Sequence, residues 1–302
     1  MKLPTPLEPA PAALSGGRRL FFKREDVHEL GAFKWRGALP TVEAFARAGA
    51  EAVVTASTGN HGAAVAWSAR RLGLKAVVFA PRGASRSKLA LIRGLAAEVR
   101  PFGADLDEAK EEAMRFAATE SLPFFEDGVE PAQYAGYGAI ADEILDQLSP
   151  APGAIVVPVG NGALIAGIGM ALRRRDAGTL LVGVVAREAP VMALSFAARR
   201  AVPCDRMATF ADGLAVRVAI PAAVARVNAV VDRMLEVSER EMADAVAALA
   251  REGIRLEGAA AAPWAALPRL PDVDGVVLLV TGRNIDDELF RRAIERPESF
   301  PA

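Results

Sequence analysis

The sequence predicts an α/β protein with largely parallel sheets. Short apolar runs alternate along the chain with longer stretches of helical periodicity. Most of the short runs are continuously apolar, which is typical of strands buried on both faces. Two glycine-rich turns, at residues 55–62 and 159–164, each follow an apolar run and open a helix. Ligands of open α/β sheets bind beyond the carboxyl ends of strands, so these turns predict two α/β layers that face one cleft.

The predicted elements follow from this alternation. The expected strands are residues 20–23, 52–56, 76–80, 98–102, 123–126, 154–159, 180–185 and 275–280. The expected helices are residues 36–48, 63–72, 88–97, 106–119, 137–148, 164–174, 239–251 and 259–267. Prolines close several of these elements, and no repeat period is present.

The composition excludes several classes of function. The 302 residues include 36 basic and 37 acidic side chains, a net charge of −1 that offers no long-range attraction to nucleic acid. No apolar run reaches the ~20 residues that span a bilayer, and the first residues lack the apolar core of a secretory signal. A single cysteine, Cys204, excludes an intrachain disulfide, and two histidines leave little for a His-rich metal site. We therefore expect a cytoplasmic protein without nucleic-acid or membrane partners.

The second glycine-rich turn can cradle a phosphate. It consists of Gly160, Asn161, Gly162, Ala163 and Leu164. Glycines allow backbone N–H groups to point at an anion, and the following helix adds its positive end. A tight turn without a ligand explains the pattern about as well. A dinucleotide is disfavoured, because Ile165 stands where G-x-G-x-x-G requires a glycine and the next strand ends without an acidic residue.

Lys34 is the candidate nucleophile. Only six of the 36 basic residues are lysines, and this one lies between Phe33 and Trp35 just before a predicted helix. Apolar flanks favour a neutral amine, which is the form that makes a Schiff base. The alternative is an ordinary surface lysine whose stem packs against its apolar neighbours.

The first glycine-rich turn and the last strand carry further polar groups. Ser57, Thr58 and Asn60 offer two hydroxyls and an amide that suit a carboxylate or an aromatic hydroxyl. The alternative is that they cap the helix that follows. After the strand at 275–280, the hydroxyl of Thr281 can hydrogen-bond a ring nitrogen.

Taken in order, these motifs resemble those of the fold-type II pyridoxal-phosphate enzymes, in the branch of threonine and serine dehydratases and serine racemases. The matching segments are Thr5-Pro6-Leu7, residues 22–26 (K-R-E-D), 32–38 (S-F-K-x-R-G-A), 57–61 (S-S-G-N-H), 159–164 (V-G-G-G-G-L), 211–213 (A-D-G) and 281–284 (S-G-G-N). The resemblance covers nearly the whole chain. It implies two open parallel-sheet domains of the tryptophan-synthase β type: a large domain of residues 1–51 and 131–302, and a small inserted domain of residues 52–130.

The resemblance also implies residue roles. Lys34 would bind pyridoxal 5'-phosphate and then act as the base on the substrate Cα proton, and Thr58 stands where the racemases place a serine that acts from the opposite face. The implied cofactor-binding residues are Phe33, Lys34, Asn60, Gly160, Asn161, Gly162, Ala163, Leu164, Glu257 and Thr281. The implied substrate-binding residues are Ser57, Thr58, His61, Tyr137 and Asp212. For Glu257, an acidic residue at a helix N-terminus is an equally good interpretation.

The function implied is that of an ammonia-lyase, which removes water and ammonia from a β-hydroxy amino acid such as threonine or serine and gives a 2-oxo acid. A neutral hydroxyl at Thr281 suits β-elimination better than a reaction through a full carbanion. A racemase or a threonine-synthase-like enzyme are the alternatives. A non-catalytic homologue is disfavoured by Lys34, and a dehydrogenase by the missing ribose-binding acid. The resemblance further implies a homodimer, and the short chain after Asn284 predicts no C-terminal regulatory region.

Some positions depart from the family pattern. The departures are Ala32 for serine, Asn161 and Ala163 for glycine, and Tyr137 for glutamine. Val185 and Val191 stand where carboxylates bind a divalent cation in this branch, and Glu188 is displaced by three residues. Oxygen ligands are required for magnesium or calcium, so we expect no metal site.

Glu126 and Asp127 follow the predicted strand at 123–126, in the region that approaches the substrate side chain in the family. Two carboxylates there would repel a dicarboxylate substrate, since unit charges ~4 Å apart interact by roughly 4 kcal/mol. A cationic side chain would then be favoured. The alternative is that both residues lie in a solvated turn.

Overall fold

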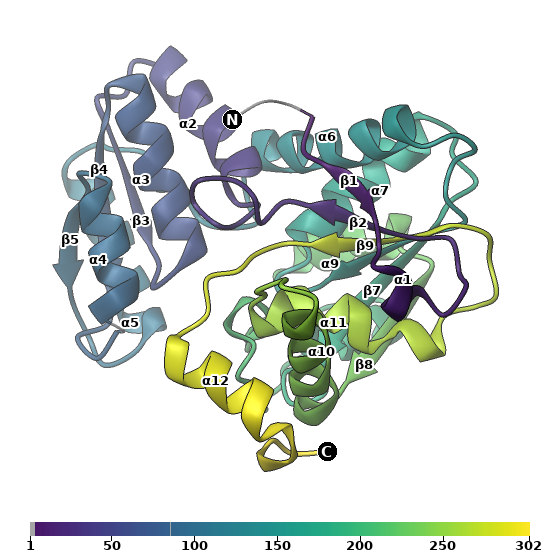
Figure 1. Cartoon of the computed structure of the whole chain (residues 1–302). Helices are drawn as coiled ribbons and strands as arrows, with labels where there is room; N and C mark the ends of the chain where they lie inside the picture. The colour runs from purple at the N-terminus through teal and green to yellow at the C-terminus, as the bar shows by residue number, and fades with distance from the viewer. Residues whose placement is uncertain (1–3, 85) are drawn as a thin grey trace. The chain divides into compact units, whose positions relative to one another are not determined.

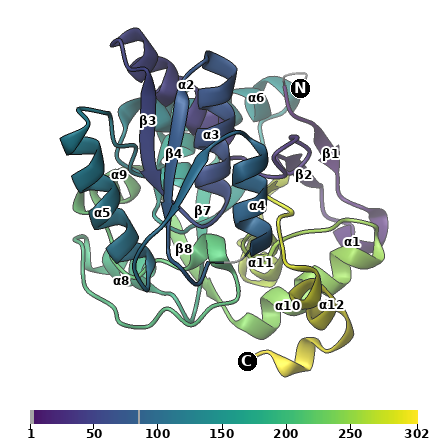
Figure 2. The same cartoon turned by 90° about the vertical axis from the view of Figure 1, so that its left-hand side faces the viewer.

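The computed structural model describes residues 4–84 and 86–302. They form two compact units, of which the smaller is Lys34–Gly136 and the larger joins the chain up to Phe33 with Tyr137–Ala302 (Figures 1 and 2). The smaller unit includes helix α2 (Trp35–Arg47), because this helix packs against α3 (Asn60–Leu72). The sequence analysis placed the residues of α2 in the large domain instead.

The smaller unit is built on a three-stranded parallel sheet. Its strands are β3 (Ala52–Ala56), β4 (Lys75–Ala80) and β5 (Glu98–Pro101), in that spatial order. Its remaining helices are α4 (Arg86–Gly94), α5 (Leu106–Thr119) and the first residues of α6 (Pro131–Gln147). Helix α5 packs on the face of the sheet that carries Val77, and α3 packs on the opposite face, where Gly62 contacts Val78 (Figure 2).

The strand predicted at residues 123–126 is reduced to a single parallel bridge between Val54 and Phe124. Phe125 N donates to Val54 O at 2.7 Å, and Val54 N donates to Pro123 O at 3.0 Å. The segment therefore runs beside β3 in the same direction. Residues 126 and 127 leave it at the edge of the sheet where β3 ends.

The larger unit contains a six-stranded sheet with the order β1-β2-β9-β6-β7-β8. The strands are β1 (Leu7–Pro9), β2 (Leu20–Arg24), β6 (Ala154–Pro158), β7 (Leu180–Ala186), β8 (Arg233–Val237) and β9 (Val276–Val280). Strand β1 pairs antiparallel with β2, and all other neighbours are parallel. The predicted α/β class with largely parallel sheets is confirmed.

Helices cover both faces of this sheet, which explains the continuously apolar strands. Helices α10 (Glu239–Arg251) and α11 (Gly258–Ala265) lie side by side on the face that carries Val182 and Val184 (Figure 1). Helices α7 (Ala163–Arg174) and α9 (Pro221–Val230) pack together on the other face, where Gly169 contacts Leu181. The unit also contains α1 (Ala12–Ser15), α8 (Val191–Ala198) and α12 (Asp287–Glu295). In the part of the chain that the structure describes, no helix is long and apolar enough to cross a membrane.

Candidate active site

The chain that leads into Lys34 is fixed to the carboxyl end of β9. Phe33 N donates to Thr281 O at 3.0 Å, and Ala32 forms an antiparallel bridge with Gly282. Lys34 follows directly and occupies the N-cap position of α2. Two of the predicted motifs, around Lys34 and Thr281, are therefore joined by backbone pairing.

The same pairing continues away from Lys34. Arg283 N donates to Gly31 O at 2.9 Å, and the Asn284 side chain donates to Leu30 O at 2.7 Å. Gly31 has a φ of 65° and no room for a Cβ, which would overlap Asn284 Oδ1. The residues 281–284 thus hold the approach to Lys34 in one conformation.

Tyr137 lies against Phe33. Its side chain is fully buried, and the two ring centroids are 5.2 Å apart with a tilt of 51°. Both residues were predicted from the family resemblance, and the structure brings them together. The tyrosine in place of the usual glutamine provides an aromatic wall beside the residue that precedes Lys34.

Glu257 lies over the backbone of Gly282. Its N–H donates to Gly282 O at 3.1 Å, and a Cβ on Gly282 would lie 2.6 Å from Glu257 Oε1. Glu257 is the N-cap of α11, but its side chain makes no capping hydrogen bond. The structure therefore places this carboxylate beside the Thr281 strand end rather than in a capping role.

The loop from Gly160 to Leu164 joins β6 to α7 and is built around two glycines. A Cβ on Gly160 would overlap the carbonyl oxygen of Gly213, and Gly162 has a φ of 87°. Asn161 Oδ1 accepts from Ala163 N at 3.1 Å, so the asparagine side chain caps the start of α7. Within the described residues, the N–H groups of Gly160, Gly162 and Leu164 donate to no protein acceptor. The loop is therefore a glycine-specific cradle that presents backbone donors at a helix N-terminus, as an anion requires.

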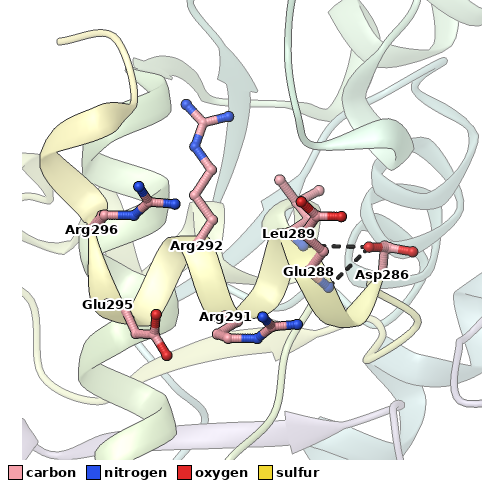
Figure 3. Close-up of a pocket in the computed structure, with 7 residues that line it drawn as sticks. All are labelled: Asp286, Glu288, Leu289, Arg291, Arg292, Glu295 and Arg296. Atoms are coloured by element: carbon pink, nitrogen blue, oxygen red, sulfur yellow. Dashed lines mark hydrogen bonds between the residues drawn. The ribbon is translucent and has the colours of Figure 1, made fainter.

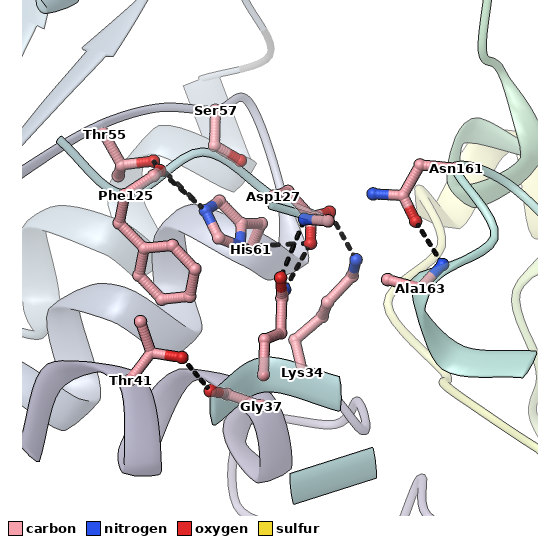
Figure 4. A network of polar contacts seen from close by, with 12 residues as sticks. Lys34, Gly37, Thr41, Thr55, Ser57, His61, Phe125, Asp127, Asn161 and Ala163 are labelled. Carbon is pink, nitrogen blue, oxygen red and sulfur yellow. Dashed lines mark hydrogen bonds and ion pairs between the residues drawn. The ribbon is translucent and has the colours of Figure 1, made fainter. Parts of the chain in front are cut away.

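In the smaller unit, Lys34 forms an ion pair that the sequence did not predict. Its Nζ lies 2.5 Å from Asp127 Oδ2 (Figure 4). Asp127 Oδ1 accepts from Gln133 Nε2 at 2.6 Å, and Gln133 Oε1 accepts from Gly128 N at 2.7 Å. The apolar surroundings expected from the aromatic neighbours of Lys34 are thus wrong for its ammonium group, which has an acidic partner.

His61 completes this cluster from α3. Its Nε2 lies 3.1 Å from Thr55 Oγ1, and that hydroxyl already donates to Phe125 O at 2.8 Å (Figure 4). His61 Nε2 therefore donates to the hydroxyl oxygen. Its Nδ1 lies 3.7 Å from Asp127 Oδ1, which is too long for a hydrogen bond. Burial lowers the pKa of His61 and outweighs the opposing charge of Asp127, so the ring is neutral.

The charges around Asp127 keep it ionised. Burial acts to raise the pKa of its carboxyl group, but the charges of Lys34 and His61 and the hydrogen bonds from Lys34 and Gln133 outweigh burial. The pKa of Asp127 consequently lies well below its usual range. Glu126 has its own partner, Lys110 on α5. The expectation of two uncompensated carboxylates is wrong, and so is the alternative of a solvated turn, because each acid is paired with a lysine.

The remaining predicted residues occupy the turn before α3 and the region of α11. Ser57 Oγ accepts from Gly59 N at 3.2 Å and from Gly62 N at 3.0 Å, so it stabilises the turn as the capping interpretation predicted. Thr58 is partly exposed within that turn, and Asn60 is the first residue of α3. Asp212 is exposed in a short 3-10 helix that packs near α11.

The positions compared with a metal site are apolar. Val185 and Val191 are fully buried. Over residues 4–84 and 86–302, no three His, Cys, Asp or Glu side chains gather in a way that could hold a metal ion.

A separate hollow of about 330 Å³ lies along α12 (Figure 3). Its lining residues are Asp286, Glu288, Leu289, Arg291, Arg292, Glu295 and Arg296. All belong to this one helix and its N-cap, and none is a predicted site residue. We therefore assign it no part in the site.

Comparison with known proteins agrees with this geometry. The chain matches the family described as "Pyridoxal-phosphate dependent enzyme" over residues 2–282. It is 34% identical to an L-threonine ammonia-lyase from Thermotoga maritima and 36% identical to one from Geobacter sulfurreducens, in each case over 93% of this chain and 71% of the relative. It also resembles the solved structure of the processed form of threonine deaminase isoform 2 from Solanum lycopersicum, with a TM-score of 0.89 and 29% identity over 96% of this chain and 87% of that one.

Proposed function

Because the chain belongs to the family of pyridoxal-phosphate dependent enzymes, we propose that it is an ammonia-lyase acting on a β-hydroxy amino acid such as threonine or serine. The products are a 2-oxo acid and ammonia. The observation that carries this proposal is the backbone pairing of Phe33 with Thr281, which ties the lysine segment to a neutral hydroxyl residue at the end of β9. Identity of 34–36% to L-threonine ammonia-lyases supports the same reaction class.

The residues fit pyridoxal 5'-phosphate. The loop at residues 160–164 is restricted to glycine at Gly160 and Gly162 and offers N–H donors to a phosphate. When bound, the cofactor supplies a ring that accepts electrons from the substrate. We assign its covalent attachment to Lys34 and its ring hydroxyl to Asn60. The ring nitrogen is assigned to Thr281, and Phe33 and Glu257 flank the ring.

We propose that Lys34 removes the substrate Cα proton. Ser57, Thr58 and His61 would hold the substrate carboxylate, with the hydroxyl hydrogens and backbone N–H groups of the turn as donors. Ser57 keeps its hydroxyl hydrogen for this purpose, since its oxygen accepts the two turn N–H groups. Tyr137 and Asp212 would border the substrate.

The experiment is a product assay with purified protein. Threonine and serine should give 2-oxo acid, while D-amino acid as the main product would instead indicate a racemase. Lys34→Ala should remain folded, lose the visible absorbance of the bound cofactor and lose turnover. Lys75→Ala, at an exposed position in β4, is the matched control and should keep both. A Lys34→Ala protein that retained colour and activity would refute the assignment.

We also propose a homodimer located in the cytoplasm. Light scattering of the purified protein tests the first part, and a monomer at micromolar concentration would contradict it. Fractionation of cells that express the chain tests the second part.

A further inference from the structure

The ion pair between Lys34 and Asp127 has the geometry of a strong interaction. A separation of 2.5 Å between Nζ and Oδ2 is that of a charge-assisted hydrogen bond. Only 17% of the Lys34 side chain and 26% of the Asp127 side chain are exposed, so water screens the pair less than it screens a surface pair. The two residues are 93 positions apart in the chain. The fold, rather than local sequence, therefore brings this carboxylate to the proposed reacting amine.

The Asp127 carboxylate is fixed independently of Lys34. Gln133, near the start of α6, donates to its other oxygen at 2.6 Å and accepts from Gly128 N at 2.7 Å. Tyr134, one residue further along α6, donates its hydroxyl to Gly128 O at 2.5 Å. These contacts hold residues 127 and 128 against one turn of a helix. The carboxylate thus presents a fixed acceptor toward Lys34.

We propose that Asp127 is a positioning residue for Lys34, an inference that rests on the proposed lyase function. The Asp127 carboxylate accepts a hydrogen bond from the Lys34 ammonium whenever Lys34 is not covalently attached to the cofactor. In the elimination, the Cα–H bond breaks and the proton goes to Lys34 Nζ. The electron pair forms the Cα–Cβ double bond as the Cβ–O bond breaks, and the hydroxyl leaves as water with a proton from Nζ. Asp127 stays ionised throughout and holds Nζ in place.

Neighbouring acids and bases do not duplicate this role. Glu126 is paired with Lys110 on α5. His61 is neutral and is oriented by Thr55, so it borders the carboxylate without donating to it. The low pKa of Asp127 is consistent with a permanent anion at this position.

The test compares the wild-type chain with Asp127→Asn, an isosteric change that removes the charge. The first measurement is the rate at which Lys34 is acylated by a neutral succinimide ester at neutral pH in the full chain after removal of the cofactor, followed by mass spectrometry. Loss of a charged acceptor should speed acylation about tenfold. In the loaded enzyme, kcat should fall by about tenfold or more with little change in KM for the substrate, and cofactor affinity should be unchanged.

Three variants separate positioning from simple structural damage. Asp127→Glu should restore part of the wild-type acylation rate and kcat, because it restores the charge. Gln133→Leu should give an intermediate acylation rate, since it releases the carboxylate without removing it. Glu126→Gln is the matched control for acylation and should leave the Lys34 rate unchanged.

The inference is overturned if Asp127→Asn acylates Lys34 at the wild-type rate, or if Glu126→Gln accelerates it equally. If Asp127→Asn fails to fold, the rates of Asp127→Glu and Gln133→Leu decide instead, and wild-type rates in both overturn the inference. Failure of the proposed function has a different signature. The wild-type enzyme would then give no 2-oxo acid, while the acylation contrast between the variants would remain.

Discussion

Substitution of Gly162 by alanine tests the proposed phosphate cradle most directly. Gly162 has a φ of 87°, and a Cβ there would lie 2.8 Å from Val227 Cγ2 and 2.9 Å from Met192 Cε. The left-handed conformation costs an L-residue about 1–2 kcal/mol. Insertion of a methyl group into this packed site adds about 1–3 kcal/mol, with the lower end favoured if the flexible methionine moves. We therefore expect Gly162→Ala to lower the free energy of unfolding by about 2–5 kcal/mol.

The measurement is urea unfolding of the chain without cofactor, together with titration of pyridoxal phosphate into the native protein. If residues 160–164 hold the phosphate, the altered loop should also bind the cofactor at least about tenfold more weakly, the equivalent of losing one charge-assisted hydrogen bond. Gly178→Ala is the matched control, because a Cβ at that position meets no atom within 4 Å and its backbone is not left-handed. That variant should be unchanged or slightly more stable. A Gly162→Ala protein with wild-type stability and cofactor affinity would refute the assigned cradle.

Three further predictions concern other parts of the molecule. Lys23 is fully buried and donates to Glu143 at 2.6 Å, so Glu143→Ala should cost about 3–5 kcal/mol of unfolding free energy, and Glu143→Gln should cost less; equal stability of all three proteins in urea would contradict this. Because Val185 and Val191 offer no oxygen ligands, turnover should be indifferent to EDTA; a loss restored by magnesium would point to Glu188 instead. Burial raises the pKa of Glu239, so the folded state binds this proton more tightly than the unfolded state, and stability should fall as pH rises from about 4.3 through the folded-state pKa. Glu239→Gln should weaken that fall in urea unfolding measured at several pH values, and an identical pH dependence would show that another group is responsible.

Helix boundaries were predictable where the sequence itself contains the cap. The predicted helices at 106–119 and 239–251 match α5 and α10 in both ends. Asp105 caps α5, and Ser238 with Glu241 forms a capping box on α10. Such caps are local, so they can be identified without knowledge of the fold.

Helix α6 shows the opposite case. It was predicted to begin at Tyr137 because Gly136 and Gly138 suggest a break, yet it begins at Pro131. A Cβ on Gly136 would overlap the carbonyl oxygen of Arg36, and one on Gly138 would lie 3.1 Å from Gly167 O. Both glycines permit close approach of another backbone. A contact of this kind depends on a distant segment and leaves no local signal.

The outermost strands of the larger sheet were missed for a related reason. Strand β1 has three residues and ends in Pro9, and β8 carries Arg233 and Glu236. Edge strands are short and carry charges or proline that discourage pairing with other chains. They therefore lack the apolar run that identified the central strands.

The candidate site was predictable as a set of segments, but the polar contacts between them were not. The motifs around Lys34 and Thr281 were both identified from sequence, and their backbone pairing follows from the position of β9 next to β2. Asp127 was identified as an acid at a strand end. Its link to Lys34 depends on the pairing of Phe124 with Val54, which a single bridge provides and which no periodicity reveals.

That pairing also separates the two adjacent acids and changes what they can do to a substrate. Along an extended segment, successive side chains point in opposite directions. Phe125 is fully buried, Glu126 reaches Lys110 on α5, and Asp127 turns to Lys34. The repulsion of roughly 4 kcal/mol expected between an acidic substrate and each free carboxylate requires an uncompensated charge. Since each carboxylate has a lysine partner, Glu126 cannot discriminate against an acidic substrate, and Asp127 can do so only while Lys34 is engaged elsewhere.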